Sequence, residues 1–200
     1  MTAIKFCGMT RAEDVDIAAQ LGVDAVGFVL WPASPRHVAV DAARALIRRL
    51  PPGITPVGVL VCPSPDEIRE ALDAGVHIVQ IHGETRPRPN DAYEQWIAAS
   101  LGSDGLQPPV DDTLTVLLDA HDPERHGGTG RTIDWSQAAV IAARRRVMLA
   151  GGLTPGNVAA AIQQVHPYGV DVSSGIEDAP GRKNPHAMNA FVAAVRKADQ

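Results

Sequence analysis

Short apolar runs rich in β-branched residues recur along this chain, and most are separated by a segment of helix length. Eight such runs are present, at residues 3–7, 25–29, 56–61, 76–81, 96–101, 114–118, 147–150 and 169–172. Runs of this length and composition are typical of strands that are buried on both faces, as in parallel sheets. The pattern therefore predicts about eight parallel strands with helices between most of them.

The predicted helices carry recognisable signals at their ends. Two capping boxes are predicted at helix starts: Thr10 with Glu13, and Ser64 with Glu67. Thr154, which precedes a proline, repeats the start signal. Three glycines each precede a β-branched residue and are predicted to cap helices at their C-terminal ends: Gly22, Gly75 and Gly169.

Strand-then-helix alternation produces a parallel sheet, either a closed barrel of eight units or an open doubly wound sheet. The number of units favours the barrel, and 200 residues is the lower limit for that fold, so some helices must be reduced to loops. Prolines in segments 84–90 and 102–109 predict shortened fourth and fifth helical connections. No linker divides the chain, so we expect a single (β/α)8-barrel domain over residues 1–200.

The composition limits the partners and the location that we expect. A net charge of −5 and a pI near 5.8 leave no overall basic surface for the phosphates of a nucleic acid. No apolar run reaches the ~18 residues of a membrane span, and the N-terminal stretch is too short for a signal h-region. We therefore expect a cytoplasmic protein without nucleic-acid or membrane partners.

The cysteines and histidines do not form a metal-binding pattern. Cys7 and Cys62 cannot make a disulfide framework, and neither lies in a spacing that would hold zinc. His77 and His82 are five residues apart on one strand and so face opposite ways. We expect no metal.

In α/β barrels the reactive groups lie where strands end, and the first strand here ends in Lys5-Phe6-Cys7-Gly8. By type alone, a free cysteine is most simply a small buried hydrophobe. However, Lys5 and Cys7 share one strand face, and a lysine does not suit the helix-covered outer face. A nearby ammonium favours the thiolate, which can act as a base. Cys7 is therefore a candidate catalytic residue.

Asp119 is a carboxylate that directly follows the sixth apolar run. Such a residue is commonly a helix or loop cap, but the next helix starts much later, near Asp134. We assign the capping role to Asp134 and predict acid–base chemistry for Asp119.

Small residues follow the seventh and eighth strands. Gly151-Gly152 and Ser173-Ser174-Gly175 carry backbone N–H groups that an anion can approach closely. Barrels often bind a phosphate at the loops after these two strands. These five residues, together with Asp171 of the eighth strand, are predicted to bind substrate.

Two further loops are candidates. Arg36 lies in a loop punctuated by proline at the mouth of the barrel, where its planar guanidinium would suit a carboxylate, although a plain surface cation fits the spacing equally well. The long loop between residues 120 and 134 is predicted to be a lid and contains Gly127, Gly128, Thr129 and Gly130.

Several short stretches fall in order at the predicted strand ends: residues 5–10, 27–29, 34–36, 79–83, 117–119, 127–130, 134–135, 149–155, 157, 170–177, 181 and 183. Through them the chain resembles the phosphoribosylanthranilate isomerase family over nearly its whole length. The resemblance implies an Amadori rearrangement of N-(5-phosphoribosyl)anthranilate to 1-(2-carboxyphenylamino)-1-deoxyribulose 5-phosphate in tryptophan biosynthesis, without a metal or an organic cofactor.

The resemblance also implies a role for each matched residue. The cysteine matched by Cys7 is the general base of that family, and the aspartate matched by Asp119 is the general acid. The arginine matched by Arg36 holds the anthranilate carboxylate, and the loops matched by Gly151-Gly152 and Ser173-Ser174 bind the phosphate. One acid and one base suffice, because protonating the ring oxygen opens the sugar to a Schiff base whose C2′ proton a thiolate can remove.

The chain departs from the family pattern in two places. Its fifth strand carries no basic residue near its end, and its fourth helical connection is short and rich in proline. Two alternatives are kept: an isomerase of a different aminoaldose, of the histidine-pathway or dual-substrate type, and a non-catalytic phosphate-binding barrel. The histidine-pathway enzyme has an aspartate where Cys7 stands, and a binding protein needs neither acid nor base. Monomer and homodimer both remain open.

Overall fold

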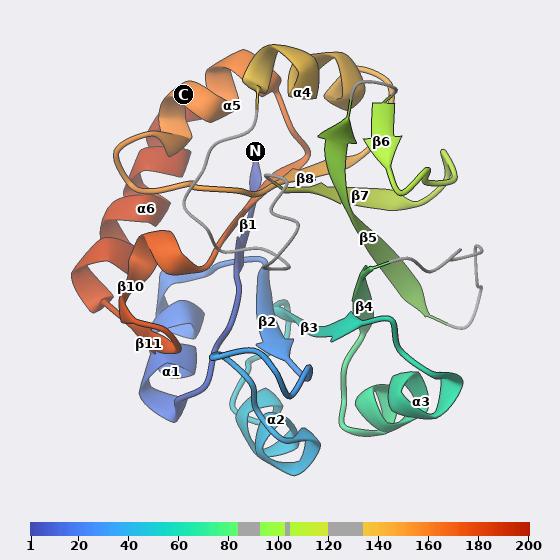
Figure 1. Cartoon of the computed structure of the whole chain (residues 1–200). Helices are drawn as coiled ribbons and strands as arrows, with labels where there is room; N and C mark the ends of the chain where they lie inside the picture. Colours follow the sequence, from blue (N-terminus) through green and yellow to red (C-terminus); the bar gives the residue numbers. More distant parts are fainter. Residues whose placement is uncertain (84–92, 103–104, 120–133) are drawn as a thin grey trace.

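Eight strands close into a parallel barrel in the computed structural model, which describes residues 1–83, 93–102, 105–119 and 134–200 (Figure 1). The barrel strands are β1 (Ala3–Phe6), β2 (Ala25–Val29), β3 (Thr55–Val61), β4 (Ile78–His82), β5 (Glu94–Gly102), β7 (Thr115–Leu118), β8 (Val147–Leu149) and β9 (Gly169–Val172). They pair in the order β4-β3-β2-β1-β9-β8-β7-β5, and the parallel pairing of β4 with β5 closes the ring. The predicted barrel is confirmed.

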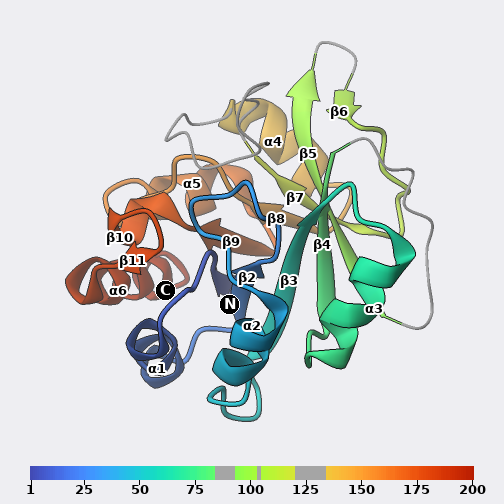
Figure 2. The ribbon, with the colours of Figure 1, turned by 60° about the horizontal axis from the view of Figure 1, so that its bottom comes forward.

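The helices lie around the outside of the strands (Figure 2). They are α1 (Ala12–Leu21), α2 (Val40–Ile47), α3 (Pro65–Asp73), α4 (Trp135–Ala142), α5 (Val158–Val165) and α6 (Pro185–Ala198), with a short 3-10 helix, η1 (Ser174–Ile176). A hairpin of β10 (Glu177–Ala179) and β11 (Arg182–Lys183) follows η1. Within the described ranges, no helix has the length and apolar character needed to span a membrane.

Alternation along the strands separates two apolar layers. Outward-facing side chains such as Phe6 and Val172 pack against the helices, including Phe191 of α6. Inward-facing side chains form a second apolar cluster inside the barrel, and they include Ala25, Val57, Ile78, Trp96, Leu117 and Met148. Because both faces are buried, the strands read as nearly continuous apolar runs.

Several predicted helix ends form as expected. The Ser64 hydroxyl accepts from the Glu67 N–H, and the Glu67 carboxylate accepts from the Ser64 N–H, which completes the capping box of α3. Asp134 caps α4 by accepting from the N–H groups of the next turn. Gly22 ends α1 in the left-handed conformation, at φ 62°, which a residue without a Cβ adopts readily.

Three other helix-end predictions are wrong. The N-cap residue of α1 is Arg11, whose side chain makes no capping hydrogen bond. The Thr10 hydroxyl, predicted to cap this helix, donates instead to the Gly181 carbonyl oxygen. Helix α5 begins at Val158, not beside Thr154. It ends at His166 in the left-handed conformation, at φ 50°, so Gly169 is not its cap. Gly169 is needed for close packing, because a Cβ there would lie 2.6 Å from the Met148 sulfur and 2.8 Å from the Ala3 carbonyl oxygen.

The fifth connection contains an element that the pattern did not predict. Strand β6 (Gly105–Gln107) pairs antiparallel with the end of β5, which runs further than the apolar run suggested. The fourth connection falls on residues 84–92, which lie outside the described residues. The predicted shortening of these two connections therefore stays a prediction.

Candidate active site

Cys7 lies at the carboxyl end of the barrel, one residue after β1. Its N–H donates to the Val172 carbonyl oxygen at 2.9 Å, which continues the β1–β9 pairing. The residue is 8% exposed, and its side chain packs against Val29 and Val59 on the inner faces of β2 and β3. A Cβ on Gly27 would come within 3.0 Å of the sulfur, so the thiol occupies space that a larger residue would close.

Lys5 shares the inward face with Cys7, as the alternation predicted. Its side chain is fully buried, and its Nζ lies 2.7 Å from Asp171 Oδ1 on the neighbouring strand β9. Lys5 and Asp171 are register partners. Asp171, predicted to bind substrate, is thus held by an internal ion pair through one of its two carboxylate oxygens.

Burial dominates the ionisation of the Cys7 thiol. Desolvation raises its pKa, the Lys5 ammonium opposes that rise, and the Asp171 carboxylate adds to it, so that the net pKa lies above the ordinary value. The sequence predicts that an ammonium beside Cys7 favours the thiolate, but it does not decide which form the resting thiol takes. The ammonium acts in the expected direction, but in the protein alone it is outweighed by the loss of hydration.

Asp119 directly follows β7, and its N–H donates to the Ala99 carbonyl oxygen at 3.0 Å, continuing the β5–β7 ladder. It stands two residues beyond Leu117, which faces the barrel interior, so it continues the inward face. The residue is half-buried. Asp119 and Cys7 thus stand at the same end of one barrel, on inward faces of different strands.

The two loops predicted to bind phosphate touch each other. Gly151 and Gly152 adopt positive φ values of 80° and 64°. A Cβ on Gly175 would lie 1.9 Å from the Leu153 carbonyl oxygen, so the backbones of the two loops are in direct contact. Asn157 braces the first loop by donating to the Gly152 carbonyl oxygen at 2.9 Å and accepting from the Thr154 N–H at 2.8 Å.

Ser173 and Ser174 lie between β9 and the rest of the second loop, where both are partly exposed. The Ser173 carbonyl oxygen accepts from Lys183 Nζ at 3.2 Å. The structure therefore brings together all five residues of the two predicted phosphate loops at the carboxyl end of the barrel.

Arg36 is not an isolated surface cation. Its Nε lies 2.9 Å from Glu177 Oε1, and its Nη2 lies 2.7 Å from Glu177 Oε2, which forms a two-point ion pair. The Arg36 side chain is 14% exposed and that of Glu177 is 4% exposed. A Cβ on Gly8 would lie 2.6 Å from the Arg36 side chain, so Gly8 lets the arginine pass over the end of β1.

Lys183 connects three parts of the site and was not predicted to take part in it. Its Nζ donates to the Cys7 carbonyl oxygen at 2.6 Å and to Glu177 Oε1 at 2.7 Å. Burial lowers the pKa of Lys183, and Glu177 only partly offsets that effect. Glu177 and Lys183 lie in the short sequence stretches that resemble the family. That resemblance is the one signal that could have identified them, since a two-residue strand such as β11 has no usable periodicity.

The predicted lid residues Gly127, Gly128, Thr129 and Gly130 lie outside the described residues. Among the residues that the structure does describe, no group of three or more His, Cys, Asp or Glu side chains is arranged to hold a metal ion.

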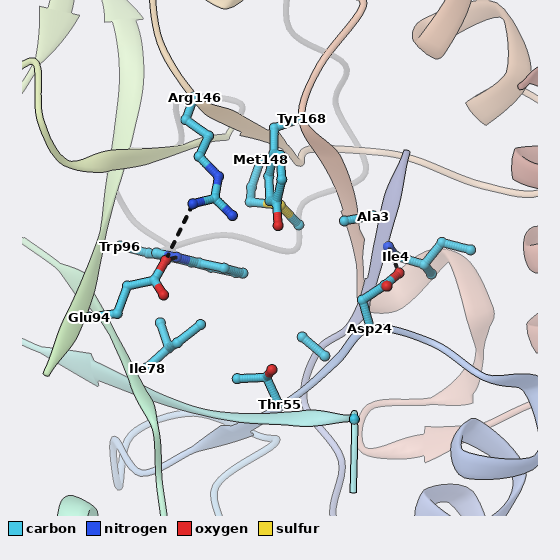
Figure 3. Close-up of a pocket in the computed structure, with 12 residues that line it drawn as sticks. Ala3, Ile4, Asp24, Thr55, Ile78, Glu94, Trp96, Arg146, Met148 and Tyr168 are labelled. Carbon is cyan, nitrogen blue, oxygen red and sulfur yellow. Dashed lines mark hydrogen bonds and ion pairs between the residues drawn. The ribbon is translucent and has the colours of Figure 1, made fainter. Parts of the chain in front are cut away.

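A cavity of about 310 Å³ opens at the opposite end of the barrel, at the amino ends of the strands (Figure 3). Its rim includes Glu94, which lies 4.0 Å from Arg146 and accepts from the Trp96 ring N–H at 2.8 Å. Arg146 in turn stacks over the Tyr168 ring at 3.7 Å. The described residues that line this cavity include none of the predicted site residues.

Known proteins share the sequence and the fold of this chain. The family model described as N-(5'phosphoribosyl)anthranilate (PRA) isomerase matches residues 4–194. A protein of Pelobacter propionicus named N-(5'-phosphoribosyl)anthranilate isomerase is 44% identical, over 98% of this chain and 97% of its own length.

Two solved structures extend the comparison. The phosphoribosyl anthranilate isomerase of Thermotoga maritima superposes with a TM-score of 0.87 at 32% identity, covering 98% of this chain and 100% of that one. A structure of a phosphoribosyl anthranilate isomerase in complex with reduced 1-(o-carboxyphenylamino)-1-deoxyribulose 5-phosphate gives 0.83 at 30% identity, with the same coverage. Because the family model matches residues 4–194 and relatives at 32–44% identity match nearly the whole chain, this chain belongs to the N-(5'-phosphoribosyl)anthranilate isomerase family.

Proposed function

We propose that this chain catalyses the Amadori rearrangement of N-(5-phosphoribosyl)anthranilate to 1-(2-carboxyphenylamino)-1-deoxyribulose 5-phosphate in tryptophan biosynthesis. The observation that carries the proposal is the position of Cys7 and Asp119, an inward thiol and an inward carboxylate at the end of the barrel where the two small-residue loops meet. A solved relative that holds a reduced form of the product supports the substrate class.

In the proposed mechanism, Asp119 donates a proton to the furanose ring oxygen as the bond from that oxygen to C1′ breaks. The product of this step is a protonated Schiff base between C1′ and the anthranilate nitrogen. The Cys7 thiolate then removes the C2′ proton, and the electron pair of that C–H bond becomes the C1′–C2′ double bond of an enaminol. Protonation at C1′ and loss of the proton on the C2′ hydroxyl give the ketone. One acid and one base are sufficient for this sequence.

The binding groups surround that reaction centre. The phosphate is proposed to lie against the amides of Gly151-Gly152 and Ser173-Ser174-Gly175, whose loops touch. Arg36 is proposed to bind the anthranilate carboxylate with the guanidinium edge that Glu177 leaves uncovered, since Glu177 occupies the Nε and one Nη2 position. Asp171 would contact substrate through Oδ2, because Lys5 engages Oδ1.

The sequence pattern supports two further proposals: that residues 1–200 form one domain and that the protein acts in the cytoplasm. For the oligomeric state, both a monomer and a homodimer are proposed. One solved structure with a TM-score of 0.83 comes from a dimeric Thermotoga maritima relative from which monomers were generated. Light scattering during size-exclusion chromatography would decide between the two oligomeric states.

The test of the function is an assay of the purified protein with N-(5-phosphoribosyl)anthranilate and, in parallel, with the histidine-pathway aminoaldose. We expect turnover of the first substrate, followed as formation of the arylamino ketose by chromatography. Turnover of the aminoaldose alone would favour the histidine-pathway alternative. Binding of both compounds without turnover of either would favour a non-catalytic barrel.

A further inference from the structure

Lys5 and Cys7 face the same small space inside the barrel. A Cβ on Gly27 of β2 would lie 3.0 Å from Lys5 Nζ and 3.0 Å from Cys7 Sγ. Because Lys5 Nζ and Cys7 Sγ each lie 3.0 Å from this Cβ position, the two atoms are separated by at most about 6 Å. The ammonium therefore acts on the sulfur at short range, through an interior that contains no bulk water.

The Lys5 side chain is charged although it is fully buried. Its Nζ lies 2.7 Å from Asp171 Oδ1, and the two side chains are 0% and 9% exposed. Burial lowers the pKa of Lys5, but Asp171 and Cys7 outweigh that effect, and the net pKa lies above the ordinary value. The interior thus holds a fixed cation near the sulfur and a fixed anion bonded to that cation.

We propose that Lys5 is a positioning residue for the Cys7 base, stabilising its thiolate form, and that Asp171 limits this effect by partly neutralising the Lys5 ammonium. The inference rests on the proposed function, in which Cys7 removes the C2′ proton. It adds that the reactivity of Cys7 is determined by the balance of two buried charges on β1 and β9. The absence of a side chain at Gly27 leaves the space in which the ammonium and the sulfur meet.

The other groups that surround Cys7 do not replace Lys5. Val29 and Val59, from β2 and β3, are apolar. Lys183, from β11, donates to the Cys7 carbonyl oxygen and exerts a weaker effect on the thiol than Lys5 does. Arg36 and Glu177 neutralise each other above Gly8.

The two charges predict opposite effects when they are removed one at a time. Losing the ammonium removes the charge that favours the thiolate and leaves the Asp171 carboxylate, which disfavours it, so the pKa of the Cys7 thiol rises further. We therefore expect Lys5→Met to slow alkylation of Cys7 by iodoacetamide at pH 8 by about 10- to 100-fold. Asp171→Asn leaves the ammonium without its counter-charge and is expected to speed alkylation several-fold.

The rates are measured by mass spectrometry of the Cys7 peptide. Cys62, which is exposed, serves as the reference in every sample and should react at the same rate in all variants. Loosened packing would speed alkylation in both single variants, so a slower rate in Lys5→Met is a result that a purely structural role does not give. Because Lys5→Met leaves a buried carboxylate unpaired and could fail to fold, the double variant Lys5→Met/Asp171→Asn removes both charges together. Its rate is expected to lie below that of the wild type but above that of Lys5→Met.

Single variants that shift the Cys7 rate in the same direction, or a double variant that reacts at least as fast as the wild type, would overturn the proposal. Turnover measured beside alkylation separates this proposal from the proposed function. If Lys5→Met slows alkylation but leaves kcat/KM unchanged, Lys5 acts on the thiol as argued and Cys7 is not the base.

Discussion

Replacing Gly175 by alanine is the smallest change that would separate the two proposed phosphate loops. The added Cβ would lie 1.9 Å from the Leu153 carbonyl oxygen and 3.2 Å from the Thr154 Cα. Ordinary contact begins at about 3.4 Å, so the two backbones must move apart by about 1.5 Å. Neither neighbour is the end of a flexible side chain, so the movement falls on the loops themselves.

The expected loss of affinity follows from the geometry of hydrogen bonds. A bond of about 2.9 Å does not survive a displacement of about 1.5 Å. Each hydrogen bond to a charged phosphate contributes about 1.5–3 kcal/mol. Losing two of them weakens phosphate binding by about 3–6 kcal/mol, or about 10²- to 10⁴-fold. The cost to folding is smaller, about 1–3 kcal/mol for an overpacked site.

Titration calorimetry with the arylamino ribulose phosphate product measures the affinity, and circular dichroism with thermal melting checks the fold. Gly156→Ala is the matched control, because its Cβ would meet only the Thr154 hydroxyl at 3.7 Å. We expect that control to bind like the wild type. A Gly175→Ala protein that keeps its native fold and binds the product within threefold of the wild type would refute the placement of the phosphate between these loops.

Three other predictions test the remaining parts of the site. Asp119→Asn should lower kcat by about 10²- to 10⁴-fold with the fold intact, as expected for loss of a general acid, and nearly normal turnover would reject that role. Cys7→Ser should reduce turnover by orders of magnitude while the product still binds, because a hydroxyl is too weak an acid to supply the basic form. A kcat equal to that of the wild type would show that Cys7 has only a packing role. Burial raises the pKa of Glu177, but Arg36 and Lys183 outweigh burial, and the net pKa lies below the ordinary 4.5. The ion pairs of Glu177 therefore stabilise the fold above pH 4.5, and this stabilisation is lost as the pH falls through the lowered pKa. Glu177→Gln should therefore melt below the wild type at pH 7, with the difference closing as the pH falls through the lowered pKa of Glu177, and a difference that is independent of pH would contradict this account.

Local sequence patterns determined the barrel and most of the residues at its carboxyl end. Eight apolar runs predict eight strands because strands buried on both faces need no polar alternation. The inward direction of Lys5 and Cys7 follows from the two-residue period of a strand. Capping at Ser64 and Asp134 is local in the same sense, since each cap and its partners lie within three residues.

The tertiary structure alone decided which groups meet. Arg36 and Glu177 are 141 residues apart in sequence, and Lys183 reaches the Cys7 carbonyl oxygen across 176 residues. No local period encodes such a pair, because it depends on where the closed barrel places the loop after β2 beside the hairpin after β9. Gly169 shows the same limit. Its sequence neighbours predict a helix cap, but β8 and β1 come so close on either side that only a residue without a side chain fits.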